Sequence, residues 1–253
     1  YQKAIDCGVD TVLLCSPPGF RPAHFEAAVK AGKHVFMEKP LATDAPGVRR
    51  IMAANQEAKK KGLMFAVGHH LRHEVKHKEA LKRIHDGAIG QIMFMRIYFN
   101  SSGVWVMPRK PGQTEMQHQV RNWYYFTWLS GDGYLEQACH SVDKVLWGMK
   151  DVPPAKCVAT GGRIFPNNEG NIYDHIDVFY EWPDGTRATM AQRQIANCYS
   201  DNSDYVIGSK GTGKGGWNPP VIRAGENLAV MLAGAQLGIT VGSIVLGRVG
   251  EPA

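Results

Sequence analysis

The chain has 253 residues, of which 44% are hydrophobic and 21% are charged. This composition is typical of globular domains with apolar cores, and it excludes an intrinsically disordered chain and a disulfide-rich miniprotein. The 29 basic and 23 acidic side chains leave a formal net charge of +6, a mild excess that suits anionic ligands or a solvated helix surface and does not indicate a nucleic-acid-binding protein.

The first 70 residues alternate predicted strands and helices joined by short links. Apolar runs predict strands at residues 9–18, 34–37 and 63–67, and helical spacing predicts helices at residues 22–30 and 43–61. We expect the second helix to begin at a Thr43 or Asp44 cap and to bury four residues: Val48, Ile51, Met52 and Ala58. Strands and helices that alternate in this way predict right-handed crossovers and a parallel sheet, the second half of a doubly wound α/β domain.

The pattern changes after Gly68. A basic amphipathic stretch at residues 73–85 precedes a strand at 92–99, a loop-rich aromatic region at 100–134 and a helix at 135–147. Further strands are predicted at residues 156–164, 175–182, 187–195 and 205–207. Runs of strands after a helix predict an α+β domain with a mainly antiparallel sheet.

The five cysteines are widely separated, and none belongs to a C-x-x-C pair. They are Cys7, Cys15, Cys139, Cys157 and Cys198. Their spacing predicts neither a zinc ribbon nor a redox dithiol, so we expect them to be reduced and structural.

Polar residues follow two of the predicted parallel strands. Ser16-Pro17-Pro18 ends the first strand, and Glu38-Lys39-Pro40 ends the second. Ligands gather at the carboxyl ends of strands in open parallel sheets, so the Lys39 ammonium is a candidate to hold a substrate oxygen. The alternative is a lysine in solvent with Glu38 as its neighbour.

The predicted helix at residues 135–147 carries Glu136, His140 and Asp143 on a face next to its apolar stripe. A carboxylate one helical turn from an imidazole orients its tautomer and favours its protonated form. His140 is therefore a candidate general base. The alternative is a stripe of charged side chains at the surface.

Three motifs occur together in a fixed order. They are AGKHVFMEKP at Ala31–Pro40, IHDGAIG at Ile84–Gly90 and GDGYLEQACHSVD at Gly131–Asp143. In order and spacing they resemble the Gfo/Idh/MocA family of nicotinamide-dependent oxidoreductases, and their joint occurrence is more specific than any one motif. The resemblance covers about residues 1–215. It implies a Rossmann domain and then an α/β domain whose sheet often mediates homo-oligomers, NAD or NADP as the cofactor, and a sugar, inositol or related polyol as the substrate.

The same resemblance implies roles for individual residues. Lys39 would contact the reacting hydroxyl and the nicotinamide ribose, while His140 would move the hydroxyl proton during hydride transfer to nicotinamide C4. Glu136 would complete the catalytic set. The implied cofactor-binding residues are Ser16, Pro17, Glu38, Lys39 and Pro40. The residues predicted to bind substrate are Arg72, Tyr124 and Asp143.

Two positions depart from the family pattern. Glu136 stands where Asp is more common, although the phrase Glu136-Gln137 is similar to a bacterial subgroup. Arg21 occupies the place of a cofactor-side histidine in many members, so this contact is left open.

The chain begins at Tyr1, and residues 1–8 read as the end of a helix that runs into a strand. We therefore expect a fragment whose phosphate-binding glycine loop would precede Tyr1. The residue that chooses between NAD and NADP would be lost with that loop. This predicts that the chain as given binds dinucleotide weakly or not at all.

Two other motifs have competing explanations. The G-x-G-x-x-G at Gly211–Gly216 precedes Trp217-Asn-Pro-Pro220 rather than a helix, so we expect a flexible loop, and Gly215 also breaks a near P-loop. His73-Glu74-Val75-Lys76-His77 matches H-E-x-x-H, a zinc motif when both histidines share one helical face. No well-placed third ligand is apparent, so we expect no metal.

The C-terminal segment is unlike the rest of the chain. No charged residue occurs from Asn227 to Gly247, and Gly234, Gly238 and Gly242 recur every fourth residue. The segment resembles the transmembrane domain of CNNM and hemolysin-C-type membrane proteins, with a join near residues 217–226; a buried glycine-rich helix is the alternative.

We therefore divide the chain into half a Rossmann domain (1–70), a substrate and oligomerisation domain (71–220) and a foreign apolar tail (221–253). The leading hypothesis is a truncated, cytoplasmic oxidoreductase, with export left open. The alternatives are a non-catalytic sugar-binding or assembly module on the same scaffold and a membrane-anchored zinc hydrolase that uses His73, Glu74 and His77.

Overall fold

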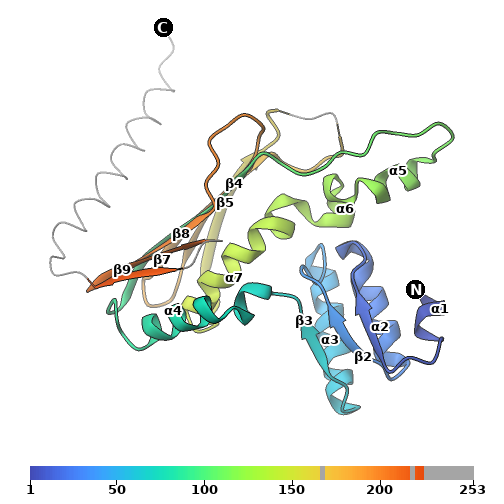
Figure 1. Cartoon of the computed structure of the whole chain (residues 1–253), viewed down its shortest axis with the longest axis horizontal. Coiled ribbons are helices and arrows are strands. Elements are labelled where there is room, and N and C mark those ends of the chain that lie inside the picture. The colour runs from blue at the N-terminus through green and yellow to red at the C-terminus, as the bar shows by residue number, and fades with distance from the viewer. Residues whose placement is uncertain (166–168, 217–219, 225–253) are drawn as a thin grey trace, which may run out of the picture.

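A computed structural model describes residues 1–165, 169–216 and 220–224. Within these ranges the chain forms two sheets, one of three strands and one of seven, in separate parts of the molecule (Figure 1). The predicted fold class is confirmed: half of a doubly wound domain is followed by a domain built on a mainly antiparallel sheet.

The smaller sheet is parallel, in the order β1–β2–β3. Its strands are β1 (Thr11–Leu14), β2 (His34–Met37) and β3 (Phe65–Val67). Its helical elements are α1 (Gln2–Ile5), the 3₁₀ turn η1 (Pro18–Phe20), α2 (Arg21–Lys30) and α3 (Ala45–Lys60). Because Leu14, Met37 and Val67 are in register, the three strands end at one edge of the sheet.

Helix α3 shows how local sequence sets this part of the fold. The Asp44 side chain accepts a hydrogen bond from the Gly47 amide at 2.7 Å, so Asp44 is the helix cap. Ile51 and Ala58 are buried with the strands, as predicted, but Val48 and Met52 are exposed. The prediction for these two residues was wrong because the core contacts only the narrow stripe that contains Ile51, Ala54 and Ala58.

The larger sheet has the order β10–β9–β8–β4–β7–β6–β5. Only β4 and β7 are parallel neighbours; the other pairs are antiparallel. The strands are β4 (Ile92–Ser101), β5 (Lys156–Gly162), β6 (His175–Glu181), β7 (Arg187–Gln194), β8 (Ser203–Gly208), β9 (Gly211–Gly216) and β10 (Val221–Ala224).

Helices α4 (Val75–His85) and α7 (Cys139–Gly148) lie against one face of this sheet, whereas α5 (Glu115–Arg121) and α6 (Thr127–Ser130) lie beyond the end of α7, on the side of the smaller domain (Figure 1). The shorter helical elements in this part of the chain are η2 (His70–His73), η3 (Trp123–Tyr125) and, directly before α7, the π-helical turn η4 (Tyr134–Ala138). Ala138 of η4 and Val145 of α7 pack against Met95, Ile97 and Met190 of the sheet. The opposite face of the sheet has no helix against it in the described residues.

The glycine-rich stretch at Gly211–Gly216 is strand β9, which pairs with β8 and β10. The flexible loop predicted there was wrong. Glycines lack the side chains from which strand periodicity is read, whereas their backbone amides and carbonyls pair as well as any others. The structure also excludes a helix start after this motif, because β9 is followed by β10 rather than by a helix within the described residues.

The predicted tail is described only at its beginning. Val221–Ala224, which the domain division places in the tail, forms β10. The apolar stretch Asn227–Gly247, for which the membrane-protein resemblance was noted, lies outside the described residues. No helix in ranges 1–165, 169–216 and 220–224 is long and apolar enough to cross a membrane.

Candidate active site

The candidate site is built on the ends of the three parallel strands. β1 leads into Ser16 and Pro17, β2 leads into Glu38, Lys39 and Pro40, and β3 leads into Gly68, His69 and His70. The first two segments were predicted from the strand-end rule. The third was missed as part of this site, although the same rule, applied to the strand predicted at 63–67, would have found it.

Arg21 holds the first two segments together. Its Nε donates to the Ser16 carbonyl at 2.8 Å, and its guanidinium also donates to the carbonyls of Glu38 (2.9 Å) and Pro40 (2.5 Å). The side chain is buried at the start of α2. Arg21 therefore fixes the geometry of both strand-end segments from a buried position. The sequence analysis had left open what this residue contacts.

Gly68 supports the Glu38 side chain. A Cβ atom on Gly68 would lie 2.7 Å from a Glu38 carboxylate oxygen, closer than van der Waals contact allows. The bare backbone at this position therefore lets the carboxylate lie across the end of β3.

Lys39 reaches from the smaller sheet to the second part of the chain. Its Nζ lies 2.5 Å from Glu136 Oε1 and also donates to the Glu136 backbone carbonyl. Both side chains are largely buried. Burial raises the pKa of the Glu136 carboxyl, and the neighbouring Lys39 ammonium opposes that rise.

A close approach of the backbones brings Glu136 to this position. Gly131 has a φ of +77°, and a Cβ on it would lie 3.0 Å from the Thr43 carbonyl oxygen. Glycine therefore allows the chain before η4 to touch the loop that follows Pro40. The π-helical turn, a geometry common at functional sites, then presents Glu136 toward Lys39.

His140 lies one turn beyond Glu136 on α7 and is only 7% exposed. Its pKa is lowered to about 3, first by burial and then by the positive charges of Lys39, His70, His69 and Lys144. The sequence analysis predicted that the Glu136 carboxylate would favour the protonated imidazole, and that prediction was wrong. Glu136 instead pairs with Lys39, so burial and the surrounding cations keep His140 neutral.

Two further histidines surround His140. The ring centroid of His70 lies 5.1 Å from that of His140, and the centroid of His69 lies 6.1 Å away. His69 Nδ1 also lies 3.8 Å from an Asp143 carboxylate oxygen. The site therefore contains three imidazoles from two elements, of which the sequence analysis placed only His140 in the catalytic set.

The predicted substrate-binding residues occupy two different environments. Arg72 donates through Nε to both Asp143 oxygens at 3.0 and 2.8 Å, and it also pairs with Asp151. These contacts bring Arg72 and Asp143 together beside His69. Tyr124 is fully buried and its hydroxyl donates to Gln194 at 2.6 Å, so in this structure it serves the packing behind η4.

The H-E-x-x-H motif does not lie on one helix. His73 ends η2, Glu74 has extended backbone angles, and His77 lies in α4. His77 is buried, with its ring nitrogens 2.9 Å from Glu74 and 3.2 Å from the Gly216 carbonyl. Among the described residues, no group of three or more histidine, cysteine, aspartate or glutamate side chains is placed to hold a metal ion.

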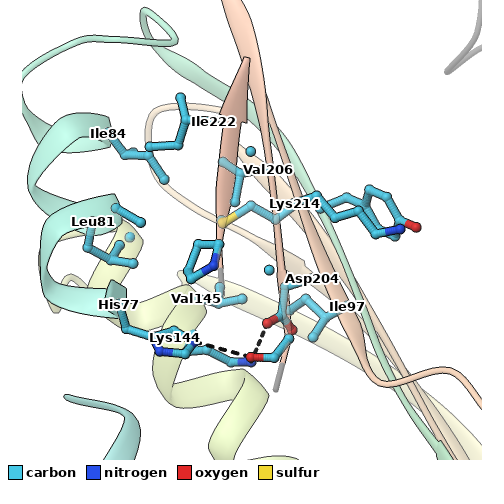
Figure 2. Close-up of a pocket in the computed structure, with 18 of the residues that line it drawn as sticks. His77, Leu81, Ile84, Ile97, Lys144, Val145, Asp204, Val206, Lys214 and Ile222 are labelled. Atoms are coloured by element: carbon cyan, nitrogen blue, oxygen red, sulfur yellow. Dashed lines mark hydrogen bonds and ion pairs between the residues drawn. The ribbon is translucent and has the colours of Figure 1, made fainter. Parts of the chain in front are cut away.

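His77 instead belongs to a mostly apolar cavity between α4, α7 and strands β8–β10. Figure 2 shows Leu81, Ile84 and Ile222 on its walls and the buried Lys144–Asp204 ion pair at one end. Neither Lys39 nor His140 lines this cavity. The motif therefore contributes to the packing of the second domain.

Two family models match most of the chain. Residues 2–69 match "Oxidoreductase family, NAD-binding Rossmann fold", and residues 77–214 match "GFO/IDH/MocA C-terminal domain". The second match alone covers more than half of the chain, and neither extends beyond residue 214.

Curated relatives include two inositol dehydrogenases. The chain is 34% identical over 214 residues to the myo-inositol 2-dehydrogenase of Thermotoga maritima, covering 83% of this chain and 58% of that protein. It is 25% identical over 205 residues to the inositol 2-dehydrogenase of Rhizobium meliloti, covering 80% and 56%. The chain thus spans about half the length of the curated relatives it matches.

A solved structure gives the same fold. The WlbA dehydrogenase of Bordetella pertussis, in complex with NADH and UDP-GlcNAcA, matches with a TM-score of 0.71 and 20% identity, covering 89% of this chain and 65% of that one. The matched family models and this shared fold lead to one conclusion: the chain belongs to the Gfo/Idh/MocA family of oxidoreductases.

Proposed function

We propose that this chain forms the catalytic cleft of a dehydrogenase that transfers hydride between a nicotinamide cofactor and a secondary hydroxyl of a sugar, inositol or related polyol. One observation carries the proposal: His140 is buried and neutral, and the Lys39 ammonium, at the carboxyl edge of a parallel sheet, lies near enough to help lower the pKa of that imidazole. The inositol dehydrogenases among its curated relatives support the substrate class.

The donors and acceptors at the strand ends suit the nicotinamide end of a dinucleotide. The Glu38 carboxylate offers an acceptor for ribose hydroxyls, and Ser16 adds a hydroxyl at the end of β1. Lys39 adds a cation that can reach both a ribose oxygen and a substrate oxygen. When bound, the nicotinamide supplies hydride transfer. The proposal leaves open the choice between NAD and NADP.

Lys39 and His140 have different roles at the substrate hydroxyl. Lys39, held by Glu136, orients the oxygen and stabilises negative charge that develops on it. His140 has the neutral form required of a general base, and it takes the hydroxyl proton as the carbon–oxygen bond gains double-bond character. Glu136 acts as a positioning residue because its carboxylate pairs with the Lys39 ammonium.

Loss of either proposed catalytic group should abolish turnover. We expect Lys39→Ala and His140→Ala each to reduce kcat/KM by about a thousandfold, because each removes a group that acts on the developing oxygen charge or its proton. The measurement is the steady-state rate of NAD+ reduction with inositols and sugars as substrates. It uses a form of the protein for which calorimetry has shown NAD+ binding. His73→Ala, at an exposed position outside the site, is the control. Full activity in both site variants would refute these roles, and polyol binding without any turnover would favour the non-catalytic module.

Burial of neutral His140 should make the folded chain sensitive to acid. Its pKa is lowered from 6.5 to about 3 on folding, so below its ordinary pKa the unfolded chain binds a proton that the folded site does not. The free energy of unfolding therefore decreases as the pH falls through the ordinary pKa, by about 2 kcal/mol between about pH 7 and about pH 5. In urea denaturation, His140→Gln should lose correspondingly less stability over this interval, and His73→Gln should behave as the original chain. An identical pH dependence in His140→Gln would contradict the buried neutral imidazole.

We also propose that the open face of the larger sheet joins copies of the chain. Val158 and Phe179 are cross-strand partners on that face and are 72% and 40% exposed. Phe179 belongs to the aromatic residues and Arg96 and Arg187 to the arginines that are enriched at protein interfaces.

In sedimentation experiments the chain should therefore behave as a dimer or larger assembly. Phe179→Asp should shift it toward the monomer, because the interface would bury an unpaired charge. Val75→Asp, at an exposed position at the start of α4, is the matched control. An unchanged assembly in Phe179→Asp, or a monomeric original chain, would contradict this interface.

A further inference from the structure

A buried general base needs a path by which its proton returns to water. His140 is 7% exposed, and on one side of it the Lys39–Glu136 pair closes the site. If His140 takes a substrate proton, as the proposed function requires, the imidazolium must be discharged before the next turnover. The structure contains a group suited to this task.

His70 is an exposed neighbour of the buried His140. Its ring centroid is 5.1 Å from that of His140, with the ring planes at 71°, a separation that one water molecule or a small side-chain rotation can bridge. The His70 side chain is 48% exposed, and its Nε2 lies 4.0 Å from a Glu74 carboxylate oxygen. The His70 ring therefore has the buried His140 as one neighbour, and it also contacts solvent and lies near the Glu74 carboxylate.

Other titratable groups near His140 are less suited to carry a proton. His69 is farther away, at 6.1 Å between ring centroids, and lies beside Asp143. Burial raises the pKa of the Cys139 thiol to about 12, so its thiolate is not available to accept a proton near neutral pH. Lys144 is held in the buried ion pair with Asp204.

We propose that His70 is the proton exit of the site, passing to water the proton that His140 removes from the substrate hydroxyl. The N–H bond formed on His140 breaks as an N–H bond forms on His70, and an N–H bond of His70 then breaks as the proton passes to bulk water, which returns both rings to their starting state. Each oxidised hydroxyl thereby yields one proton to solvent, which balances the hydride transfer.

The surrounding charges favour this direction of transfer. The ammonium groups of Lys39 and Lys144 repel a proton on His140. At His70 the Glu74 carboxylate lies 4.0 Å from Nε2, and about half of the side chain is exposed to solvent. The charged and titratable groups around the two rings are the Lys39–Glu136 pair, Lys144 and His69 near His140, and Glu74 near His70.

Solvent exchange of the His140 ring N–H tests this path without cofactor or turnover. The full chain, labelled with ¹⁵N-histidine, would be studied by NMR, with the His140 signal assigned by its loss in His140→Gln. We expect exchange in His70→Phe, which keeps a ring but no nitrogen, to be about tenfold slower or more. Added imidazole should restore the rate, an effect that a merely structural role of His70 would not produce.

His73→Phe is the matched control, because His73 is exposed on the same turn and is not among the charges that act on His140. It should leave the exchange rate unchanged, and unchanged backbone amide spectra would show that each variant is folded. A smaller slowing in His70→Phe, or no response to imidazole, would overturn the proton exit.

A second experiment measures turnover in a form of the protein that binds NAD+. His70→Phe should lower kcat at low buffer concentration and recover with imidazole, whereas His140→Ala should lose turnover under both conditions. Loss of activity in His140→Ala with normal turnover in His70→Phe would refute the exit alone. Slowed exchange in His70→Phe in a protein with no dehydrogenase activity would refute the proposed function and leave the path intact.

Discussion

The ion pair between Lys39 and Glu136 is the contact on which the rest of the site depends. It joins a loop at the edge of the parallel sheet to the π-helical turn that precedes α7, and both side chains are largely buried. Loss of one partner from a buried pair leaves an uncompensated charge, so the two groups require each other. The close backbone approach at Gly131 brings the two elements near enough for the pair to form. With Glu136 held in this way, His140 lies one turn later, near enough to the Lys39 ammonium for that charge to help lower the pKa of the imidazole.

Charge pairing around the site determines which group can take a proton. Glu136 pairs with Lys39, and Asp143 pairs with Arg72, so these carboxylates are already committed to cations. His140 instead lies among positive charges in a buried position, and it is therefore neutral near pH 7. In the proposed dehydrogenase, this neutral imidazole would act as the base and the nearby ammonium as the electrostatic stabiliser, the two functions needed for proton removal from a hydroxyl.

The sequence predicts the parallel strands and the Lys39 and His140 positions because short apolar runs and strand ends have strong local signatures. It does not predict β9, since glycines carry no periodic side-chain pattern. The partner of Glu136 also could not be read from helical spacing, which favours a local contact with His140. The tertiary fold supplies Lys39 instead, from 97 residues earlier in the chain. His70 was overlooked because its histidine-rich surroundings suggested a metal motif, and the break at Glu74 that separates His73 from α4 is visible only in the folded backbone.

The convergence of Lys39 and His140 is tested most directly by NMR titration of the His140 imidazole in the chain and in Lys39→Met. The account predicts that His140 titrates well below its ordinary pKa of 6.5, and that removal of the Lys39 ammonium raises that value because one of the repelling charges is gone. A His140 that titrates near 6.5, or that does not respond to the loss of Lys39, would show that the two groups do not share one cleft.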